Sequence, residues 1–544
     1  MKQIYINGNV ITVDKDRPRA EAFLVEDGLF CAVGDTAEIL ALKDKNTEVV
    51  DLQGATVIPG FNDSHLHLLN YAYGKSKADL SQCKSTEEVI RAGRQYIEAR
   101  HIPKGRWVVG TGWNEYFYPD RHILTREDLD AISTEHPIVF TRNCVHTVVV
   151  NSLALDLMGI DADTPDPPGG IIRRDDKGDA TGLLNENARY LAYDQLPDAS
   201  EEEIKDMLDL AMKELASYGL TSLQTDDFET FSGKNYDVII SAYKALVGEG
   251  RMSARIYEQC LLPSISRLKG FLSKGYTTGH GDALFQIGPL KLLVDGSVGP
   301  HTAFLSREYS DDPGNFGVCQ FTQEELDELV LEAQTNGMHV LCHGIGDAAM
   351  VRILNSYEKA MVKTGDPDHR NGIVHVQIST FDILKRMKKL NVIAYAEPVC
   401  IDGDMHCVED RVGSDRIKES YAYRTMLDLG LRCGYSSDCP VDPVNPIVSA
   451  YIAVNRKDHN GWPEGGWYPE QKLTIEEVLE GFTMGSAYCS FEENIKGSIT
   501  PGKYADFALL SENILETPPE DLLQVRVLET YLGGKRIYRL DPQS

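Results

Sequence analysis

Two histidines near the start of the chain have the spacing of a metal site. His65 and His67 follow an apolar run, residues 57–58, that ends in Pro59-Gly60. In an extended strand alternate side chains lie on one face, so both imidazoles would point the same way. Two imidazoles on one face at the end of a strand can bind one divalent metal ion. Each histidine could equally satisfy local hydrogen bonds, so the rest of the chain has to decide.

Four more side chains with suitable chemistry stand in or just after apolar, strand-like runs. In chain order they are Lys291, His343, His375 and Asp438. Each one alone is weak evidence, because a histidine or aspartate at the end of a strand is more often structural. Their order and spacing, one or two strand–helix units apart, make the set much stronger, since the active-site residues of a barrel sit where its strands end. We therefore treat the six residues as one candidate site.

The elements that must position these residues alternate between helix and strand through most of the chain. Amphipathic segments, several of them ended by glycine, precede short apolar runs. Helices are expected at residues 202–218, 322–335, 380–390 and 421–429, and strands at residues 221–224, 287–294, 339–342, 373–376, 392–396 and 432–435. Repeated strand–helix units favour a parallel sheet, so the expected fold is α/β, a (β/α)8 TIM-like barrel.

The two chain ends and one long segment depart from this alternation. Residues 1–56 and 490–544 hold short β-prone runs broken by glycine turns, so we expect a small β-sandwich domain built from both ends, although two separate caps would also fit. The barrel would then span residues 57–489. Within it, residues 70–200 fit the alternation poorly and are expected to form an insertion after strand 1, which would act as a lid or substrate region.

The insertion carries a cluster of aromatic side chains: Trp113, Tyr116, Phe117 and Tyr118. Such a cluster is more often buried packing than substrate contact. Its place soon after the candidate metal strand favours substrate contact, so the packing and the substrate-binding interpretations both remain open. Trp113 is accordingly a candidate for substrate binding.

At this point the chain resembles a known group, the amidohydrolase superfamily, and within it amidohydrolase family 3, which includes N-substituted formamide deformylases. The superfamily pattern is His-x-His on strand 1, Lys on strand 4, His on strands 5 and 6, and Asp on strand 8. The traits of family 3 are matched by residues 59–67 (Pro-Gly-Phe-Asn-Asp-Ser-His-Leu-His), 291–297 (Lys-Leu-Leu-Val-Asp-Gly-Ser), 343–347 (His-Gly-Ile-Gly-Asp) and 437–441 (Ser-Asp-Cys-Pro-Val). The resemblance covers nearly the whole chain.

The resemblance implies metal-assisted hydrolysis with one or two divalent ions, zinc being the first choice. One ion would be held by His65, His67 and Asp438, and the second by His343 and His375. A protonated lysine has no lone pair and cannot bind metal, so Lys291 would be carboxylated by CO₂ and its carbamate would bridge both ions. Asp438 would be the catalytic residue, which accepts a proton from water and passes it to the leaving amine.

Two further histidines are candidates for substrate binding. His146 precedes an Asn-containing segment similar to one in the family, and a core histidine is the competing interpretation. His301 stands where relatives often carry Arg, so the specificity of this chain is expected to differ. Asp226 and Glu186 also follow strand-like runs and are expected to be structural or to support the site from behind.

Composition excludes some partners. The 544 residues include 54 Lys plus Arg and 83 Asp plus Glu, a net charge of −29, which argues against nucleic acid or an anionic membrane as partner. No apolar run is long enough for a membrane helix or a signal peptide. The 11 cysteines show no framework spacing, so we expect a reducing cytoplasm. The expected partner is a small-molecule substrate, and a homodimer is possible.

The leading function is hydrolysis of an amide-type C–N bond, in an N-substituted formamide or an N-acyl compound. Deamination or the opening of a cyclic amide would use the same metal set and is the alternative enzyme function. A non-catalytic binding protein on an inherited barrel is a different class. All six ligand positions are filled, which argues against that last alternative.

Overall fold

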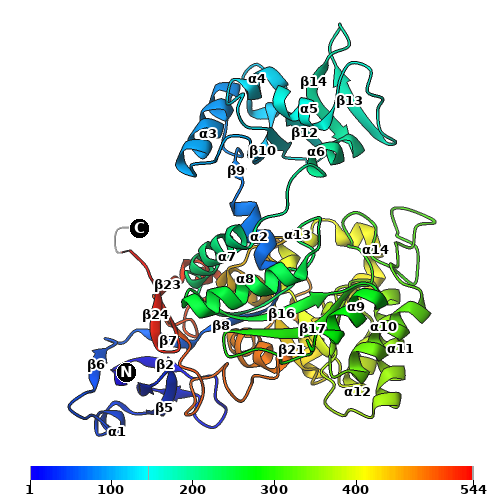
Figure 1. Cartoon of the computed structure of the whole chain (residues 1–544). Helices are drawn as coiled ribbons and strands as arrows, with labels where there is room; N and C mark the ends of the chain where they lie inside the picture. The colour runs from blue at the N-terminus through cyan, green and yellow to red at the C-terminus, as the bar shows by residue number, and fades with distance from the viewer. Residues whose placement is uncertain (1, 145, 542–544) are drawn as a thin grey trace. The chain divides into compact units, whose positions relative to one another are not determined.

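The computed structural model describes residues 2–144 and 146–541, and the chain folds into two compact units. Residues 1–70, 201–230 and 234–544 belong to the first, here called the barrel unit. Residues 71–200 and 231–233 belong to the second, here called the inserted unit. Figure 1 shows the course of the chain through both.

Eight parallel strands form the centre of the barrel unit (Figure 1), which confirms the predicted (β/α)8 fold. In sheet order they are β8 (Phe61–Leu66), β15 (Leu220–Thr225), β16 (Arg255–Leu261), β17 (Phe285–Leu293), β18 (Val340–Gly344), β19 (Gly372–His375), β20 (Ile393–Ala396) and β21 (Cys433–Tyr435). The first and last strands meet through two main-chain hydrogen bonds beyond β21. Asp438 N donates to His65 O at 3.0 Å and His67 N donates to Cys439 O at 2.8 Å. Closure therefore places the His-x-His pair beside Asp438.

Helices connect these strands, as parallel pairing requires. They include α7 (Glu201–Ala216), α8 (Tyr236–Glu249), α9 (Ile265–Ser273), α10 (Gln323–Thr335), α11 (Asp347–Thr364), α12 (Phe381–Lys389) and α15 (Tyr423–Asp428). The helices α16 (Pro446–Asn455) and α17 (Ile475–Glu480) follow the last barrel strand, β21. Local sequence sets their ends: Thr322 and Glu325 form a capping box at the start of α10, and Gly337 follows its end at φ +75°. The helix predicted at 421–429 begins later, at Tyr423, because Tyr421 lies in the left-handed region at φ +49°.

Both chain ends contribute strands to one β-sheet. In the six-stranded sheet β24-β23-β22-β7-β2-β3, the strand β7 (Thr56–Pro59) pairs in parallel with β2 (Asn9–Ile11) and antiparallel with β22 (Phe507–Leu510). The same sheet holds β3 (Arg19–Ala20), β23 (Val527–Leu532) and β24 (Lys535–Arg539), and a four-stranded sheet holds β1 (Lys2–Ile6), β4 (Ala22–Glu26), β5 (Leu29–Gly34) and β6 (Glu48–Asp51). Aromatic rings fill the core between them, including Phe507 stacked on Tyr531 at 4.4 Å between centroids. The expected joining of the two ends is thus present.

Gly60 links this β domain directly to the barrel. A Cβ atom at this position would lie 2.2 Å from Thr221 Oγ1, closer than any real contact, so the approach of β8 to β15 requires glycine. The chain therefore passes from β7 into β8, and from there to the His-x-His pair, without a loop that could shift the strand.

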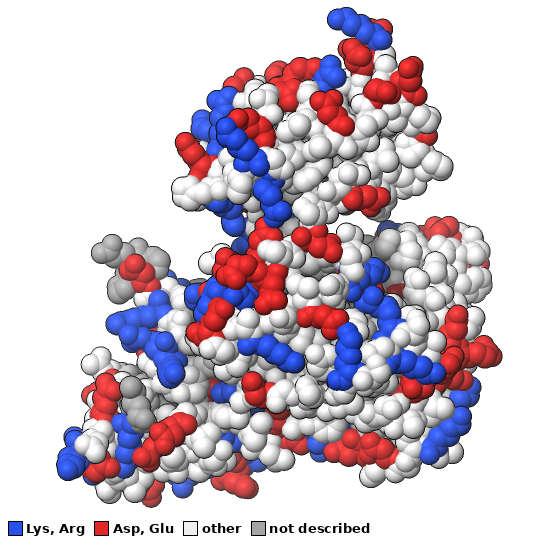
Figure 2. Space-filling model, in the orientation of Figure 1, with Lys and Arg blue, Asp and Glu red and all other residues white. Residues whose placement is uncertain are grey.

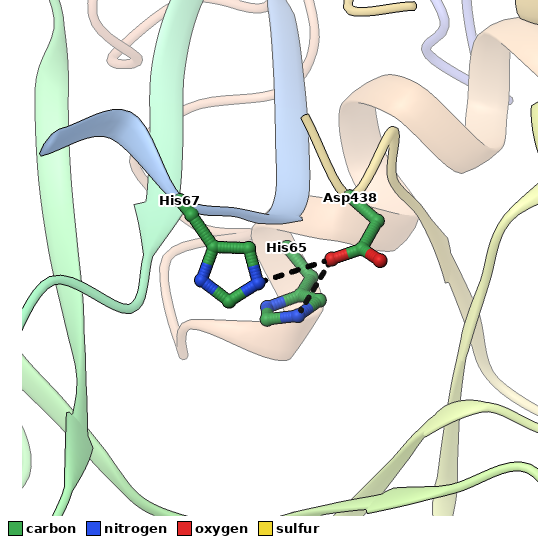
Figure 3. Close-up of side chains that lie close together, drawn as sticks. All are labelled: His65, His67 and Asp438. Atoms are coloured by element: carbon green, nitrogen blue, oxygen red, sulfur yellow. Dashed lines mark ion pairs between the residues drawn. The ribbon is translucent and has the colours of Figure 1, made fainter. Parts of the chain in front are cut away.

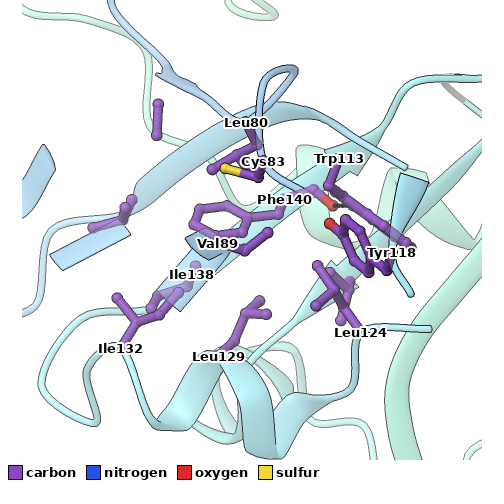
Figure 4. Packing of buried hydrophobic residues seen from close by; sticks show 13 residues of the cluster. Leu80, Cys83, Val89, Trp113, Tyr118, Leu124, Leu129, Ile132, Ile138 and Phe140 are labelled. Carbon is purple, nitrogen blue, oxygen red and sulfur yellow. Dashed lines mark hydrogen bonds between the residues drawn. The ribbon is translucent and has the colours of Figure 1, made fainter. Parts of the chain in front are cut away.

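The inserted unit has its own sheet and its own core. Its six strands run in the order β13 (Gly170–Arg174), β14 (Ala180–Glu186), β12 (Thr147–Val150), β11 (Ile138–Arg142), β10 (Val108–Trp113) and β9 (Ala78–Asp79). The helices α3 (Thr86–Ala99), α4 (Arg126–Asp130) and α5 (Ser152–Met158) accompany it. Figure 4 shows the packing of its core, in which Trp113 and Tyr118 lie among aliphatic side chains.

The chain carries a strong net negative charge of −29. Acidic and basic side chains are interspersed on the face shown in Figure 2. Among the described residues, no helix is both long and apolar enough to cross a membrane.

Candidate metal centre

The six predicted residues lie at the carboxyl end of the barrel strands. His65 is in β8 and His67 follows that strand directly, while Lys291 is in β17 and His343 in β18. His375 is the last residue of β19, and Asp438 follows β21. The sheet register aligns neighbouring strands so that Leu293 is opposite His343 and Gly344 opposite His375. Because all strands are parallel, their ends share one face of the barrel, where catalytic residues of this fold are found.

His65, His67 and Asp438 form a buried group that suits one metal ion (Figure 3). Asp438 Oδ1 lies 3.3 Å from His65 Nε2 and 3.2 Å from His67 Nε2. This oxygen is buried and has no hydrogen-bond partner among the described residues. Two ligand atoms of a tetrahedral site with bonds of about 2.0 Å are about 3.3 Å apart. The three side chains therefore already have the spacing of metal ligands.

His343 and His375 form a second pair beside the first group. His375 Nε2 lies 2.7 Å from His343 Nδ1, and their ring centroids are 4.2 Å apart. The ring of His375 is also 6.1 Å from that of His65, between centroids. The amine of Lys291 is fully buried and lies 3.0 Å from His65 Nε2. All six predicted residues are thus brought together.

Each of the four imidazoles has an oxygen acceptor on its outer side. The pairs are His65 Nδ1 with Gln259 Oε1 at 2.6 Å, His67 Nδ1 with Asp226 O at 3.2 Å, His343 Nε2 with Gly296 O at 3.1 Å, and His375 Nδ1 with Glu397 Oε2 at 2.5 Å. An amide or main-chain carbonyl oxygen can only accept, so the outer nitrogen facing it carries the proton. In the neutral form of His65, His67 and His343 the inner nitrogen then presents a lone pair, as a metal ligand must. The donor set therefore fits a divalent metal.

Sequence reasoning missed two of these outer partners, Gln259 and Glu397. Gln259 lies in β16 and Glu397 follows β20, two strands that supply no predicted ligand. A search for polar residues at the ends of every barrel strand would have found both. Asp226 contacts His67 through its main-chain oxygen, so it supports the site from behind as expected.

Burial shapes the protonation of the group. It lowers the pKa of His65 well below its usual value and also lowers the pKa of the Lys291 amine. Burial by itself would lower the pKa of His67 too, but Asp438 and Asp226 outweigh it and raise that pKa to about 9. His65 and His67 in turn outweigh the effect of burial on Asp438 and hold its pKa well below the usual range. The group therefore combines a neutral His65 imidazole and an ionised Asp438 carboxylate with a His67 whose inner proton a divalent ion would replace.

Asp63 holds the two sides of the barrel seam together. Its Oδ1 accepts the main-chain N–H of His65 at 3.1 Å and that of Ser437 at 3.2 Å, and its Oδ2 accepts the Ser437 hydroxyl at 2.5 Å. The side chain is fully buried, and burial raises its pKa to about 7. Asp63 thus fixes His65 relative to the segment that carries Asp438. Asp63 belongs to the motif at residues 59–67, but the sequence alone did not indicate this role.

The three predicted substrate-binding residues lie in different surroundings. His301 is in the segment after β17, where its Nε2 contacts Asp311 Oδ1 at 3.0 Å and its ring meets the edge of Tyr309. His146 is in the inserted unit, half exposed, with Nδ1 3.0 Å from Glu186 Oε2; its neighbour at position 145 lies outside the described residues. Substrate binding by these two histidines stays a prediction.

Trp113 requires a correction. Its side chain is completely buried in the core of the inserted unit, and its indole N–H donates to Phe140 O at 3.1 Å. The packing interpretation of this residue is therefore right, because a fully covered indole with its one donor already paired has no surface left for a substrate. Tyr116 and Phe117, by contrast, are exposed.

Comparison with known proteins gives a consistent result. The Amidohydrolase family model matches residues 48–538. YtcJ of Bacillus subtilis (strain 168) is 32% identical, and the match covers 99% of each chain. N-substituted formamide deformylase of Arthrobacter pascens is 27% identical, with 97% of each chain covered.

Solved structures agree. An uncharacterized metal-dependent hydrolase from Pyrococcus furiosus is 27% identical, with a TM-score of 0.79 over 95% of this chain and 100% of that one. The match therefore extends through both the barrel unit and the inserted unit. With a family match over most of its length and relatives that it covers from end to end, this chain belongs to the amidohydrolase family and is a hydrolase that acts on C–N bonds.

Proposed function

We propose that this amidohydrolase cleaves the C–N bond of a small-molecule amide, an N-substituted formamide or an N-acyl compound. The observation that carries the proposal is the group formed by His65, His67 and Asp438, with a buried carboxylate oxygen 3.2 and 3.3 Å from two imidazole nitrogens. The substrate class is supported by the name of the Arthrobacter pascens relative, N-substituted formamide deformylase.

We assign two metal positions to the donor set. His65, His67 and Asp438 would hold the first ion, and His343 and His375 the second. Zinc is the preferred ion, because imidazole and carboxylate ligands suit it. A divalent cation supplies Lewis acidity here, which lowers the pKa of water and polarises the scissile carbonyl.

Lys291 would bridge the two positions as a carbamate. The neutral amine attacks CO₂, forms an N–C bond and releases one proton, which leaves a carboxylate on the side chain. This proposal is supported by the complete burial of Lys291 and by its position 3.0 Å from His65 Nε2. A crystal structure would test it: density for only an unmodified amine would contradict the bridge.

Asp438 would move the proton. Its carboxylate can accept a proton from the attacking water, and the same carboxyl can then donate it to the leaving amine. Burial keeps bulk water from competing for that proton.

The test is a hydrolysis screen with metal content measured on the same samples. N-substituted formamides and N-acyl amino acids are expected to react. Turnover of cyclic amides alone would contradict the proposed substrate class. Asp438→Asn should reduce kcat/KM by at least about 10²-fold, while circular dichroism shows an intact fold. Unchanged activity in this variant would contradict the proton-transfer role. Fewer than one bound ion per chain in the wild-type protein would contradict the metal site.

We also propose a reducing cytoplasmic location, supported by the eleven cysteines, all of which are free thiols. Cell fractionation that finds the protein in an oxidising compartment would contradict this.

A further inference from the structure

Glu397 differs from the other acceptors behind the four imidazoles. The acceptors at 2.6, 3.2 and 3.1 Å from the other three rings are an amide oxygen and two main-chain oxygens, all of them neutral. Glu397 contributes a carboxyl group, at 2.5 Å from His375 Nδ1. Asp295 also approaches His343, at 3.4 Å, but its oxygens already accept the main-chain N–H groups of Ile345, Gly346 and Phe304.

The surroundings of Glu397 hold its side chain in place. It is 1% exposed, directly after β20. Its Oε1 accepts the Ser436 hydroxyl at 3.4 Å, and its main-chain oxygen accepts the Tyr423 hydroxyl at 2.9 Å. Potential ligand atoms of His375, Glu397 and Asp438 all lie within 4.8 Å of one another. The carboxyl group is therefore fixed beside both assigned metal positions.

The backbone at His375 explains why such support is needed. His375 has φ +77° and the next residue, Val376, has φ +51°. These are left-handed conformations that non-glycine residues seldom adopt, and strain of this kind persists only where the surroundings enforce it. Strand geometry alone does not aim the His375 ring, because its backbone leaves the strand conformation at that residue.

We propose that Glu397 is a positioning residue, which fixes His375 as a ligand of the second metal position. Nδ1–H donates a hydrogen bond to the carboxylate, so Nε2 keeps its lone pair toward His343 and the interior of the site. A carboxylate behind a ligating imidazole also makes that imidazole a better donor. The inference deepens the proposed function and rests on its two metal positions.

The opposite protonation state would overturn the inference. A protonated Glu397 would donate to Nδ1 and place the ring proton on Nε2, where no metal could bind. ¹⁵N spectra of the zinc-loaded protein, with the His375 signal assigned by its loss in His375→Asn, should show Nδ1 protonated and Nε2 without a proton.

Metal affinity gives the second measurement. Glu397→Ala should weaken binding of the second ion by about 10- to 100-fold, measured by chelator competition and by metal content per chain. Glu397→Gln should restore most of that affinity, because its amide oxygen can accept from Nδ1 as Gln259 accepts from His65. Rescue by Gln separates positioning from a direct ligand role of the carboxylate. Thermal unfolding checks that each variant is folded.

Glu493→Ala is the matched control. Glu493 contacts Arg370 at 2.8 Å. Arg370 lies just before β19, at the opposite end of this strand from His375. Loss of this carboxylate should leave both ions bound with wild-type affinity. If wild-type protein binds no metal, the proposed function fails. If it binds two ions and Glu397→Ala binds them equally well, only the Glu397 inference fails.

Discussion

The histidine group of the barrel unit and the aromatic cluster of the inserted unit both stood out in the sequence, yet the structure uses them differently. His65 and His67 meet Asp438 across the barrel seam, 3.3 and 3.2 Å from one carboxylate oxygen. Trp113 instead lies fully buried among residues such as Phe140 and Leu124. The histidine group presents polar atoms toward a common centre, whereas Trp113 and Tyr118 lie in a packed core and Tyr116 and Phe117 are exposed.

The difference follows from what each residue type requires. A buried imidazole or carboxylate must find a polar partner, because an unpaired polar group in the interior costs free energy. A parallel barrel brings the ends of all its strands to one face, so polar residues at those ends can satisfy one another or a metal. An indole gains most of its free energy from being covered, and any adjacent apolar layer can do this.

Metal removal should give the largest contrast between the two units. Treatment with a chelator is expected to abolish hydrolysis, and added Zn²⁺ should restore it, because the proposed chemistry depends on the ion. At a metal concentration of about 100 times Kd, binding stabilises the folded state by about 2.7 kcal/mol. Hydrogen exchange should therefore slow in peptides that cover β8 and β19 when metal is present. Equal slowing in peptides that cover β10 to β12 would contradict the prediction that metal stabilises the barrel unit and not the inserted unit.

Trp113→Ala tests the other side of the comparison. Truncating a fully buried tryptophan should destabilise the protein by about 3–5 kcal/mol, measured by denaturant unfolding, while metal content per chain stays at the wild-type value. Trp113→Phe keeps most of the apolar surface and should cost less, although Phe140 O loses its indole donor. A stable alanine variant with a raised KM would show that this residue contacts substrate after all.

His146→Ala should have the smallest effect on stability. Its side chain and that of Glu186 are 60% and 58% exposed, and exposed ion pairs contribute at most about 1 kcal/mol. The midpoint of thermal unfolding should hardly change. KM is the informative quantity. An increase in KM with unchanged stability would support the predicted role of His146 in substrate binding, whereas an unchanged KM would contradict that role. KM of His301→Ala is measured in parallel, which shows whether His146, His301 or both contribute to substrate binding.

Much of the barrel could be predicted from local sequence. The strand expected at residues 287–294 is β17, and the helix expected at 322–335 is α10, because apolar periodicity and the Thr322 cap act over a few residues. The expected joining of the chain ends is present as well, since β7 pairs with β22. The predicted role of residues 70–200 as a lid stays a prediction.

The sequence by itself determined which chemical groups stand at the ends of the barrel strands: His65, His67, Lys291, His343, His375 and Asp438 each follow or end an apolar run. Only the tertiary structure decided what stands behind each imidazole and which aromatic residue is covered. His65 finds its acceptor 194 residues away in Gln259, and His375 finds Glu397 directly after the neighbouring strand, β20. Local patterns encode periodicity over a few residues, whereas these contacts depend on strand order and register, which are set when the whole barrel closes.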